Sequence, residues 1–207
     1  MKATIKAIED GPLVLSSDDN HNIIFQDNNT ITAGNPAYLC RCGRSKTKPF
    51  CDGTHRNIKF KSHREIKDEV IQEYVGKDIT VNFNRSICAG AANCVKHKEV
   101  FSSGSSTNWI DPDKDTNEKI IETIKACPSG ALSYTLEDKR HIDSRDEAQI
   151  SIIKNGPYNV QAIEHEFRPV PTNFSATKYT LCRCGMSKNK PYCDYSHAEN
   201  NWDDQEE

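Results

Sequence analysis

The feature that most constrains this chain is a seventeen-residue pattern that occurs twice, the second copy 142 positions after the first. The first copy ends at His55 and reads LCRCGRSKTKPFCDGTH, and the second ends at His197 and reads LCRCGMSKNKPYCDYSH. Each copy places three cysteines and one histidine at the same spacing: Cys40, Cys42, Cys51 and His55, then Cys182, Cys184, Cys193 and His197. Thiolates and imidazoles are the side chains that bind zinc and iron–sulfur centres. We therefore expect two metal centres built by one pattern.

The duplication reaches beyond these side chains. The stretch ATIKAIEDGPLVL, from Ala3 to Leu15, aligns without a gap with AQISIIKNGPYNV, from Ala148 to Val160. Both stretches alternate apolar and polar residues, contain a Gly-Pro pair and continue with a second short apolar run, which is typical of a β-hairpin. The chain therefore contains two copies of one small β-rich module, separated by a different middle part.

The middle part has a strand–helix–strand pattern of its own. Residues 78–83 and 131–136 alternate like strands, and isoleucines at positions 120, 121 and 124 predict a helix over residues 117–126. Asp115 or Thr116 can cap the start of this helix, and the Cys-Pro pair after it favours its end. The remaining three of the nine cysteines lie around this helix: Cys88, Cys94 and Cys127.

The two repeated cysteine patterns resemble the motif of the CDGSH iron–sulfur family, C-x-C-x2-S-x3-P-x-C-D-G-[ST]-H. The first copy satisfies every position, and the second departs once, with Tyr195 where the family has glycine. Glycine permits backbone dihedrals that tyrosine disfavours, so this departure bears on the backbone turn after Asp194 and leaves the ligand positions unchanged. The resemblance implies one 2Fe–2S cluster per motif, held by the three cysteines and the histidine. The alternative is a zinc site, but zinc sites usually pair cysteines as C-x2–4-C, and these loops begin with the tighter C-x-C.

The middle part resembles a single-cluster bacterial ferredoxin. Such ferredoxins supply C-x2-C-x2-C and a distant cysteine before proline, whereas Ala91 takes the middle position of the first group here. The resemblance implies a cluster held by Cys88, Cys94 and Cys127, which we expect to be 3Fe–4S, with 4Fe–4S as the alternative. His97 is the nearest candidate for a fourth ligand, although we interpret it as a solvated loop histidine.

These resemblances divide the chain into an N-terminal segment (residues 1–75), a middle segment (76–137) and a C-terminal segment (138–207). The N-terminal and C-terminal segments would each be a CDGSH-type 2Fe–2S module, and the middle segment a ferredoxin-like domain. The expected fold class is α+β. The small size of each part suggests that the metal centres also stabilise the fold.

Animal members of the CDGSH family are typically homodimers, whereas this chain carries both copies itself. We therefore expect the two modules to pack as an intramolecular pseudo-dimer around or beside the middle segment. Ile5, Ile8, Ile150 and Ile152 are expected in the shared β core. The protein would then be a monomer, because the symmetric interface is already used.

Charged residues recur around both cysteine patterns. Asp52 and Asp194 follow the third cysteine and are expected to cap the short helix that presents the histidine. We expect the nearby cations to stabilise a reduced cluster or to dock an acidic redox partner; they are Arg41, Arg44, Lys46, Lys48, Arg183, Lys188 and Lys190. The acidic end, residues 203–207, is expected to be a frayed and solvated tail.

Composition limits the remaining possibilities. Nine cysteines cannot form a complete set of intramolecular disulfides, and thiols kept for metal suggest a reducing compartment, so we expect a cytoplasmic protein. No apolar stretch approaches the roughly 18 residues of a membrane span, and no membrane anchor is expected. The net charge of −3 and the lack of a long basic tract argue against a nucleic-acid partner.

We find no nucleophile elbow, phosphate loop or dinucleotide fingerprint, so an enzyme is not expected. The first hypothesis is electron transfer through three iron–sulfur centres, between a reductase and an acceptor that the sequence does not name. The second is iron–sulfur cluster storage or transfer, or redox or pH sensing. The third is a zinc-stabilised interaction module.

Overall fold

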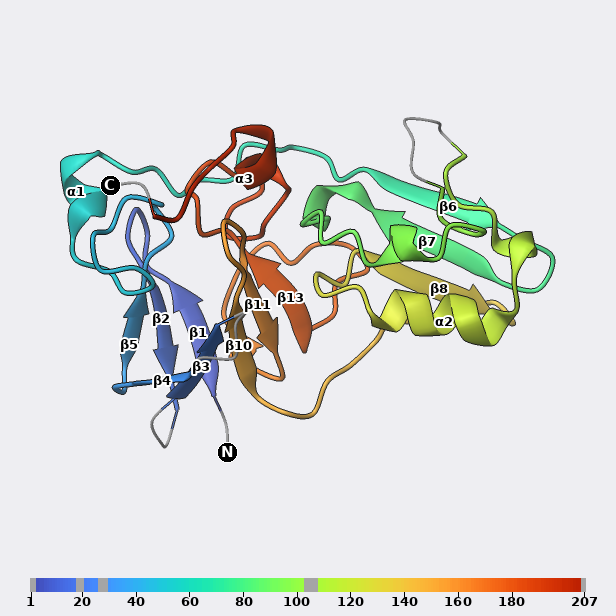
Figure 1. Cartoon of the computed structure of the whole chain (residues 1–207), viewed down its shortest axis with the longest axis horizontal. Helices are drawn as coiled ribbons and strands as arrows, with labels where there is room; N and C mark the ends of the chain where they lie inside the picture. Colours follow the sequence, from blue (N-terminus) through green and yellow to red (C-terminus); the bar gives the residue numbers. More distant parts are fainter. Residues whose placement is uncertain (1–2, 18–20, 26–29, 103–107, 206–207) are drawn as a thin grey trace.

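The computed structural model describes residues 3–17, 21–25, 30–102 and 108–205. Within these residues the fold is α+β, with three small sheets and few, short helices (Figure 1). The strands within residues 4–39 and 149–181 lie side by side, and the strands within residues 71–141 occupy the other end of the long axis (Figure 1). No helix in the described ranges combines the length and the apolar character that crossing a membrane requires.

The first sheet has the strand order β12-β1-β2-β5 and comes mainly from the N-terminal segment. Strands β1 (Thr4–Ala7) and β2 (Leu13–Ser16) form the predicted hairpin, and β5 (Ala37–Leu39) pairs with β2. The edge strand β12 (Glu164–His165) belongs to the C-terminal segment and pairs in parallel with β1. One strand of this sheet is therefore supplied by the other half of the chain.

The second sheet likewise includes strands supplied by the other half of the chain. Its order is β13-β11-β10-β3-β4, and it is centred on the second predicted hairpin, β10 (Gln149–Ile152) and β11 (Tyr158–Gln161). Strand β13 (Lys178–Leu181) pairs with β11 on one side. On the other side β10 pairs in parallel with β3 (His21–Phe25), which comes from the N-terminal segment together with β4 (Thr30–Ala33).

Both sheets contribute to one hydrophobic core. Ile5, Ile150 and Ile152 are buried in the same cluster, as the repeat predicted, and each contributes roughly 1.5–3 kcal/mol by burial. The expectation for Ile8 is wrong, because its side chain is 43% exposed. Strand β1 ends at Ala7, so Ile8 belongs to the turn, where its side chain lies against Gly11.

The third sheet has the order β6-β7-β8-β9 and is formed by β6 (Ile71–Val75), β7 (Thr80–Asn84), β8 (Leu132–Leu136) and β9 (Lys139–His141). Helix α2 (Asn117–Lys125) packs against β8 and buries Ile120 and Ile124, as its periodicity predicted. Thr116 is the N-cap residue of α2. The predicted strands over residues 78–83 and 131–136 correspond to β7 and β8.

The two cysteine-rich loops lie back to back. We call residues 40–55 the first cysteine loop and residues 182–197 the second; they end in the short helices α1 (Thr54–Asn57) and α3 (Ser196–Glu199). A Cβ atom on Gly43 would collide with the backbone of Cys184, and a Cβ atom on Gly185 would lie 2.6 Å from the carbonyl oxygen of Cys42. Only glycine allows the two backbones to approach so closely.

Gly43→Ala is therefore expected to destabilise the protein more than Gly53→Ala. Both glycines have positive φ angles, of 79° and 89°, so both variants carry backbone strain of roughly 1–2 kcal/mol. Nothing lies within 4 Å of a Cβ atom at Gly53, whereas overpacking at Gly43 adds roughly 1–3 kcal/mol. Urea unfolding of the two variants measures this difference. Equal losses of stability would contradict the back-to-back packing.

Candidate metal centres

The first cysteine loop brings its four predicted residues together in two pairs. The sulfur atoms of Cys40 and Cys42 are 3.6 Å apart, and the sulfur of Cys51 is 3.3 Å from Nδ1 of His55. Cys40 and Cys42 are buried at the end of β5, and Cys51 and His55 are half-buried around the start of α1. The four predicted residues thus form two pairs, each made of residues two or four positions apart in the sequence.

The second cysteine loop repeats this geometry. The sulfur atoms of Cys182 and Cys184 are 3.6 Å apart, and the sulfur of Cys193 lies 3.4 Å from Nδ1 of His197. All three cysteines of this loop are buried, and His197 is half-buried. Cys193 is thus more enclosed than Cys51, its counterpart in the first loop.

The separation within each pair suits two ligands of one tetrahedral ion. Metal–sulfur and metal–nitrogen bonds of about 2.3 and 2.0 Å at a tetrahedral angle place two ligand atoms roughly 3.5–3.8 Å apart. Each cysteine loop therefore offers two such pairs, one of two thiols and one of a thiol and an imidazole.

The other motif residues hold this geometry. The backbone N–H of Cys40 donates to the carbonyl of Pro49, and the hydroxyl of Ser45 donates to the carbonyl of Phe50. The equivalent bonds recur in the second loop, from Cys182 to Pro191 and from Ser187 to Tyr192. Serine and proline of the motif thus close the turn that brings the third cysteine back to the first two.

The aspartate after the third cysteine joins two parts of each loop. One carboxylate oxygen of Asp52 accepts from the backbone N–H of Lys46 and the other from that of Thr54, and these bonds lower the pKa of Asp52 to about 2. Asp194 accepts in the same way from Lys188 and Ser196. The predicted contact with the start of the histidine-bearing helix is therefore confirmed, with an additional bond to the preceding turn.

Within each C-x-C pair, one thiol has a lowered pKa and therefore ionises more readily. The hydrogen bond from Cys42 lowers the pKa of Cys40, although burial opposes this effect. The bond from Cys184 likewise lowers the pKa of Cys182. A thiolate is the form of cysteine that binds metal, so this effect favours metal binding.

A buried arginine lies between the first two cysteines of each loop. Arg41 donates to the carbonyls of Gly11 and Ile8, and Arg183 donates to the carbonyl of Ile153, so each arginine fastens its loop to a hairpin turn. Burial lowers the pKa of Arg41 to about 10, and the negative charge of Cys182 in the other loop acts in the opposite direction. A cation of the first loop thus lies close to the ligands of the second.

Two contacts between the segments were missed by the sequence analysis. The hydroxyl of Tyr158 donates to the carbonyls of Cys40 and Pro49 in the first cysteine loop, and the indole of Trp202 donates to the carbonyl of Gly43. Tyr158 occupies the repeat position of Leu13. The sequence signal that could have revealed this contact is the hydroxyl group of Tyr158, at a core position where the other copy has the apolar Leu13.

The expectation of a frayed acidic tail is wrong at Asp204. This residue is buried, its carboxylate accepts a hydrogen bond from Arg183 at 2.5 Å, and it exchanges backbone–side chain bonds with Asn155. The tail therefore closes over the buried guanidinium of the second cysteine loop. Composition alone did not reveal this, because the partner lies twenty or more positions away in the sequence.

The three cysteines of the middle segment also lie near one another. Burial raises the pKa of Cys88, and the charge of Cys127 adds to this effect. Burial raises the pKa of Cys94 to about 11, with further contributions from Cys127 and Cys88. Cys88 and Cys94 are thus both close enough to Cys127 to be affected by its charge, which fits one shared centre. Cys88 and Cys94 lie at the ends of short 3-10 turns, and Cys127 follows α2.

His97 has both ring nitrogens engaged elsewhere. Its Nδ1 lies 2.9 Å from the hydroxyl of Thr123, and its Nε2 lies 3.0 Å from a carboxylate oxygen of Asp115. The interpretation of His97 as a solvated histidine is wrong, since only 14% of its side chain is exposed. These bonds direct the ring to α2 and the loop before it, and they leave no free nitrogen for a metal.

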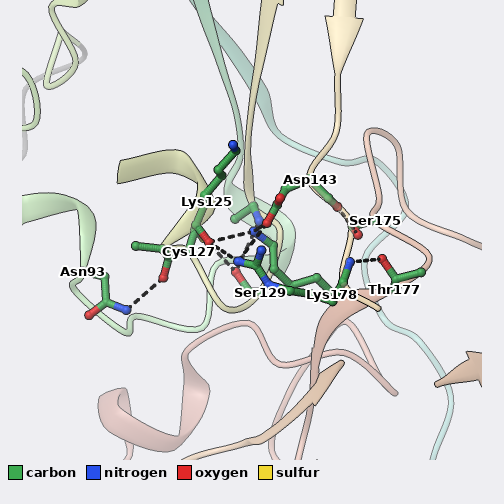
Figure 2. A network of polar contacts seen from close by, with 11 residues as sticks. Asn93, Lys125, Cys127, Ser129, Asp143, Ser175, Thr177 and Lys178 are labelled. Atoms are coloured by element: carbon green, nitrogen blue, oxygen red, sulfur yellow. Dashed lines mark hydrogen bonds and ion pairs between the residues drawn. The ribbon is translucent and has the colours of Figure 1, made fainter. Parts of the chain in front are cut away.

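A buried ion pair within the C-terminal segment lies against the end of α2 in the middle segment (Figure 2). Lys178 on β13 is 2% exposed, and its ammonium group lies 2.6 Å from Asp143 and donates to the carbonyl of Lys125 at the end of α2. Arg145 binds the same carboxylate and the same carbonyl. The negative charge of Cys127 acts on Lys178, although burial as the larger effect lowers the lysine's pKa. A buried cation therefore lies beside the middle cysteines.

The fold and its three groups of cysteines define an iron–sulfur protein, and comparisons with known proteins agree. The family model described as "Iron-binding zinc finger CDGSH type" matches residues 10–56 and 155–198, and the model described as "Divergent 4Fe-4S mono-cluster" matches residues 74–137. The chain therefore contains two CDGSH-type regions on either side of a divergent mono-cluster domain.

Individual relatives match parts of the chain. Protein YjdI of Escherichia coli K12, described as uncharacterized, is 38% identical over 61 residues, which are 30% of this chain and 80% of YjdI; the O157:H7 protein of the same name matches equally. The "CDGSH iron-sulfur domain-containing protein 2 homolog" of Drosophila ananassae is 45% identical over 58 residues, which are 27% of this chain and 43% of that protein. No solved structure matches.

Removing Asp143 is expected to destabilise the protein strongly. Asp143→Ala leaves the ammonium group of Lys178 buried without its carboxylate, a change that typically costs about 3–5 kcal/mol. The control is Glu73→Ala, which breaks a more exposed ion pair with Arg140 and should cost at most about 1 kcal/mol. Guanidinium unfolding of both variants measures the two losses. Similar small effects would contradict a structural role for the buried pair.

Proposed function

We propose that the chain is an electron-transfer protein with three iron–sulfur centres, not an enzyme. Two 2Fe–2S clusters would be held by the first and second cysteine loops, and one 3Fe–4S cluster by the middle cysteines. The proposed ligands are Cys40, Cys42, Cys51 and His55, then Cys182, Cys184, Cys193 and His197, and finally Cys88, Cys94 and Cys127. A separate redox protein would supply or accept the electrons.

The observation that carries this proposal is the pairing of ligands in each cysteine loop. Two pairs, each at the separation expected on one ion, fit a cluster of two irons in which one iron takes two thiolates and the other a thiolate and an imidazole. A zinc site would require all four side chains around a single ion. The pairing thus favours iron–sulfur clusters over a zinc-stabilised interaction module.

Two further features suit electron transfer. When bound, such clusters accept and release single electrons. The buried guanidinium groups of Arg41 and Arg183 lie next to the proposed ligands and would stabilise the added negative charge. The back-to-back contact at Gly43 and Gly185 brings the two cysteine loops together, which supports the proposal that electrons pass between their clusters.

We also propose that the N-terminal and C-terminal segments form an intramolecular pseudo-dimer and that the protein is a monomer. The reciprocal parallel pairings of β1 with β12 and of β10 with β3 support this arrangement. The cross-segment bonds of Tyr158 support it as well. Sedimentation equilibrium of the loaded protein tests the monomeric state.

Cluster storage, cluster transfer or redox sensing is the second candidate function. It is favoured by the first cysteine loop, where Cys51 and His55 line a cavity of about 520 Å3 and Cys51 is less buried than Cys193. A more accessible cluster is easier to release. Electron transfer to cytochrome c, as an artificial acceptor, should outpace delivery of iron and sulfide to an apo-ferredoxin; the reverse order would favour the second candidate.

Anaerobic preparation with full loading is expected to give about seven irons and about eight sulfides per chain, as two 2Fe–2S clusters and one 3Fe–4S cluster require. Eight irons would indicate 4Fe–4S in the middle segment. Iron and sulfide analysis with metal quantification measures this content directly. Three zinc ions without sulfide would overturn the proposal.

Ala91→Cys is expected to convert the middle centre from 3Fe–4S to 4Fe–4S. The new thiol completes the C-x2-C-x2-C spacing and can bind a fourth iron. Electron paramagnetic resonance should then lose the signal of the oxidised three-iron cluster, and the iron content should rise by about one per chain. The control, Ala92→Cys, adds an equally exposed thiol outside that spacing and should leave the signal unchanged. A wild-type protein that already holds four irons there would contradict the three-iron assignment.

A further inference from the structure

We infer that Tyr195 joins the second cysteine loop to the loop of Cys88 and Cys94. The second CDGSH centre is then the intermediate in electron transfer between the middle centre and the first centre. This inference rests on the proposed electron-transfer function. It assigns a role to the one position at which the second motif departs from the family pattern. The contact also gives the three centres a linear order.

The Tyr195 side chain lies against Gly90, two residues after Cys88. A Cβ atom on Gly90 would collide with ring atoms Cδ2 and Cε2 of Tyr195 and would lie 3.0 Å from Cγ. The absence of a side chain at Gly90 therefore makes room for the aromatic ring. The same ring makes an edge-on contact with the imidazole of His197, with centroids 5.8 Å apart. Tyr195 thus touches the middle loop on one side and a proposed ligand of the second loop on the other.

The first cysteine loop provides an internal comparison. Gly53 occupies the position equivalent to Tyr195, and both residues have a left-handed backbone, with φ of 89° and 82°. A side chain at Gly53 would point into open space, since nothing lies within 4 Å. Tyrosine in this conformation costs roughly 1–2 kcal/mol relative to glycine. The contact with Gly90 offsets this strain only in the second loop, which faces the middle segment.

Other bonds fix the same interface. Asn189 is fully buried and donates to the carbonyl of Ser86, and Arg85 donates to the carbonyl of Asp194 and pairs with Glu199. These partners lie on the 3-10 turn just before Cys88. The negative charge of Cys88 also contributes to raising the pKa of Cys193, although burial is the larger cause. Ligands of the two centres therefore lie within electrostatic reach of each other.

The second cysteine loop meets the first loop on its other side. The contacts of Gly43 with Cys184 and of Gly185 with Cys42 join these two loops. Figure 1 shows α3 of the second loop between α1 of the first loop, at one end of the molecule, and the middle segment at the other end. The second loop is thus in contact with both neighbours, and the first loop and the middle segment are separated along the long axis.

The inferred step moves one electron and changes no covalent bond. With the clusters bound, oxidation of the middle centre would release the electron that reduces the second centre, and oxidation of the second centre would reduce the first in the same way. A one-electron donor protein supplies the middle centre, and a one-electron acceptor protein oxidises the first, so the electron count balances.

The test uses the fully loaded chain and the variants Tyr195→Gly and Tyr195→Phe. Tyr195→Gly restores the family residue and relieves backbone strain, so folding should be preserved. We expect weaker magnetic coupling between the middle and second centres, and electron redistribution between them about tenfold slower. Tyr195→Phe keeps the ring and should behave like wild type. Deazaflavin photoreduction with freeze-quench electron paramagnetic resonance gives both readouts.

The matched control is Gly53→Tyr, which places tyrosine at the equivalent position of the first loop. It should leave the coupling between the middle and second centres unchanged, because that side chain faces open space. The inference would be overturned if the protein has its full iron and sulfide content but Tyr195→Gly and Tyr195→Phe show the same magnetic coupling and the same rate of electron redistribution. That result would leave the proposed function standing. Absence of iron and sulfide in the wild type would instead overturn the proposed function.

Discussion

The back-to-back approach of the two cysteine loops is the constraint on which the rest of the structure depends. Gly43 and Gly185 each present bare backbone to the opposite loop, and Tyr158 donates across the same contact to Cys40 and Pro49. Once the loops are held in this way, their hairpins lie side by side and can share one hydrophobic core. The exchanged strands β12 and β3 then complete sheets that neither half of the chain forms alone.

The near symmetry of the two halves ends where the middle segment docks. Tyr195, Lys178 and Asn189 all belong to the C-terminal segment, and all three contact the middle segment or its flanking residues. Lys178 is unusual among them because it is a buried charge in a β-strand, compensated by Asp143 and by the carbonyl of Lys125. Such pairs contribute little net stability but penalise arrangements that separate them. Duplication therefore supplied two similar modules, and one of them acquired the polar and aromatic contacts that hold a third part.

Local patterns in the sequence were sufficient for the two hairpins, for β7, β8 and α2, and for the four residues that each cysteine loop brings together. The alternation around both Gly-Pro turns predicted the hairpins, and the isoleucine spacing predicted α2. The strand exchange was not predictable in the same way, because β12 has only two residues and its partner lies about 160 positions away. Asp204 and His97 were misread because their partners are distant in sequence: a charged tail and a loop histidine look solvated until Arg183, Thr123 and Asp115 are seen beside them.

The parallel pairing of β1 with β12 has a consequence for synthesis on the ribosome. Thr4 and Ile5 are translated 160 residues before their partners Glu164 and His165. The β1 edge of the N-terminal hairpin therefore remains unpaired until β12 has been synthesised. An unpaired strand edge is a site for association with other chains. Contacts of such long sequence separation also close slowly. We therefore expect the nascent chain to depend on chaperones or early metal loading until its second half has been made.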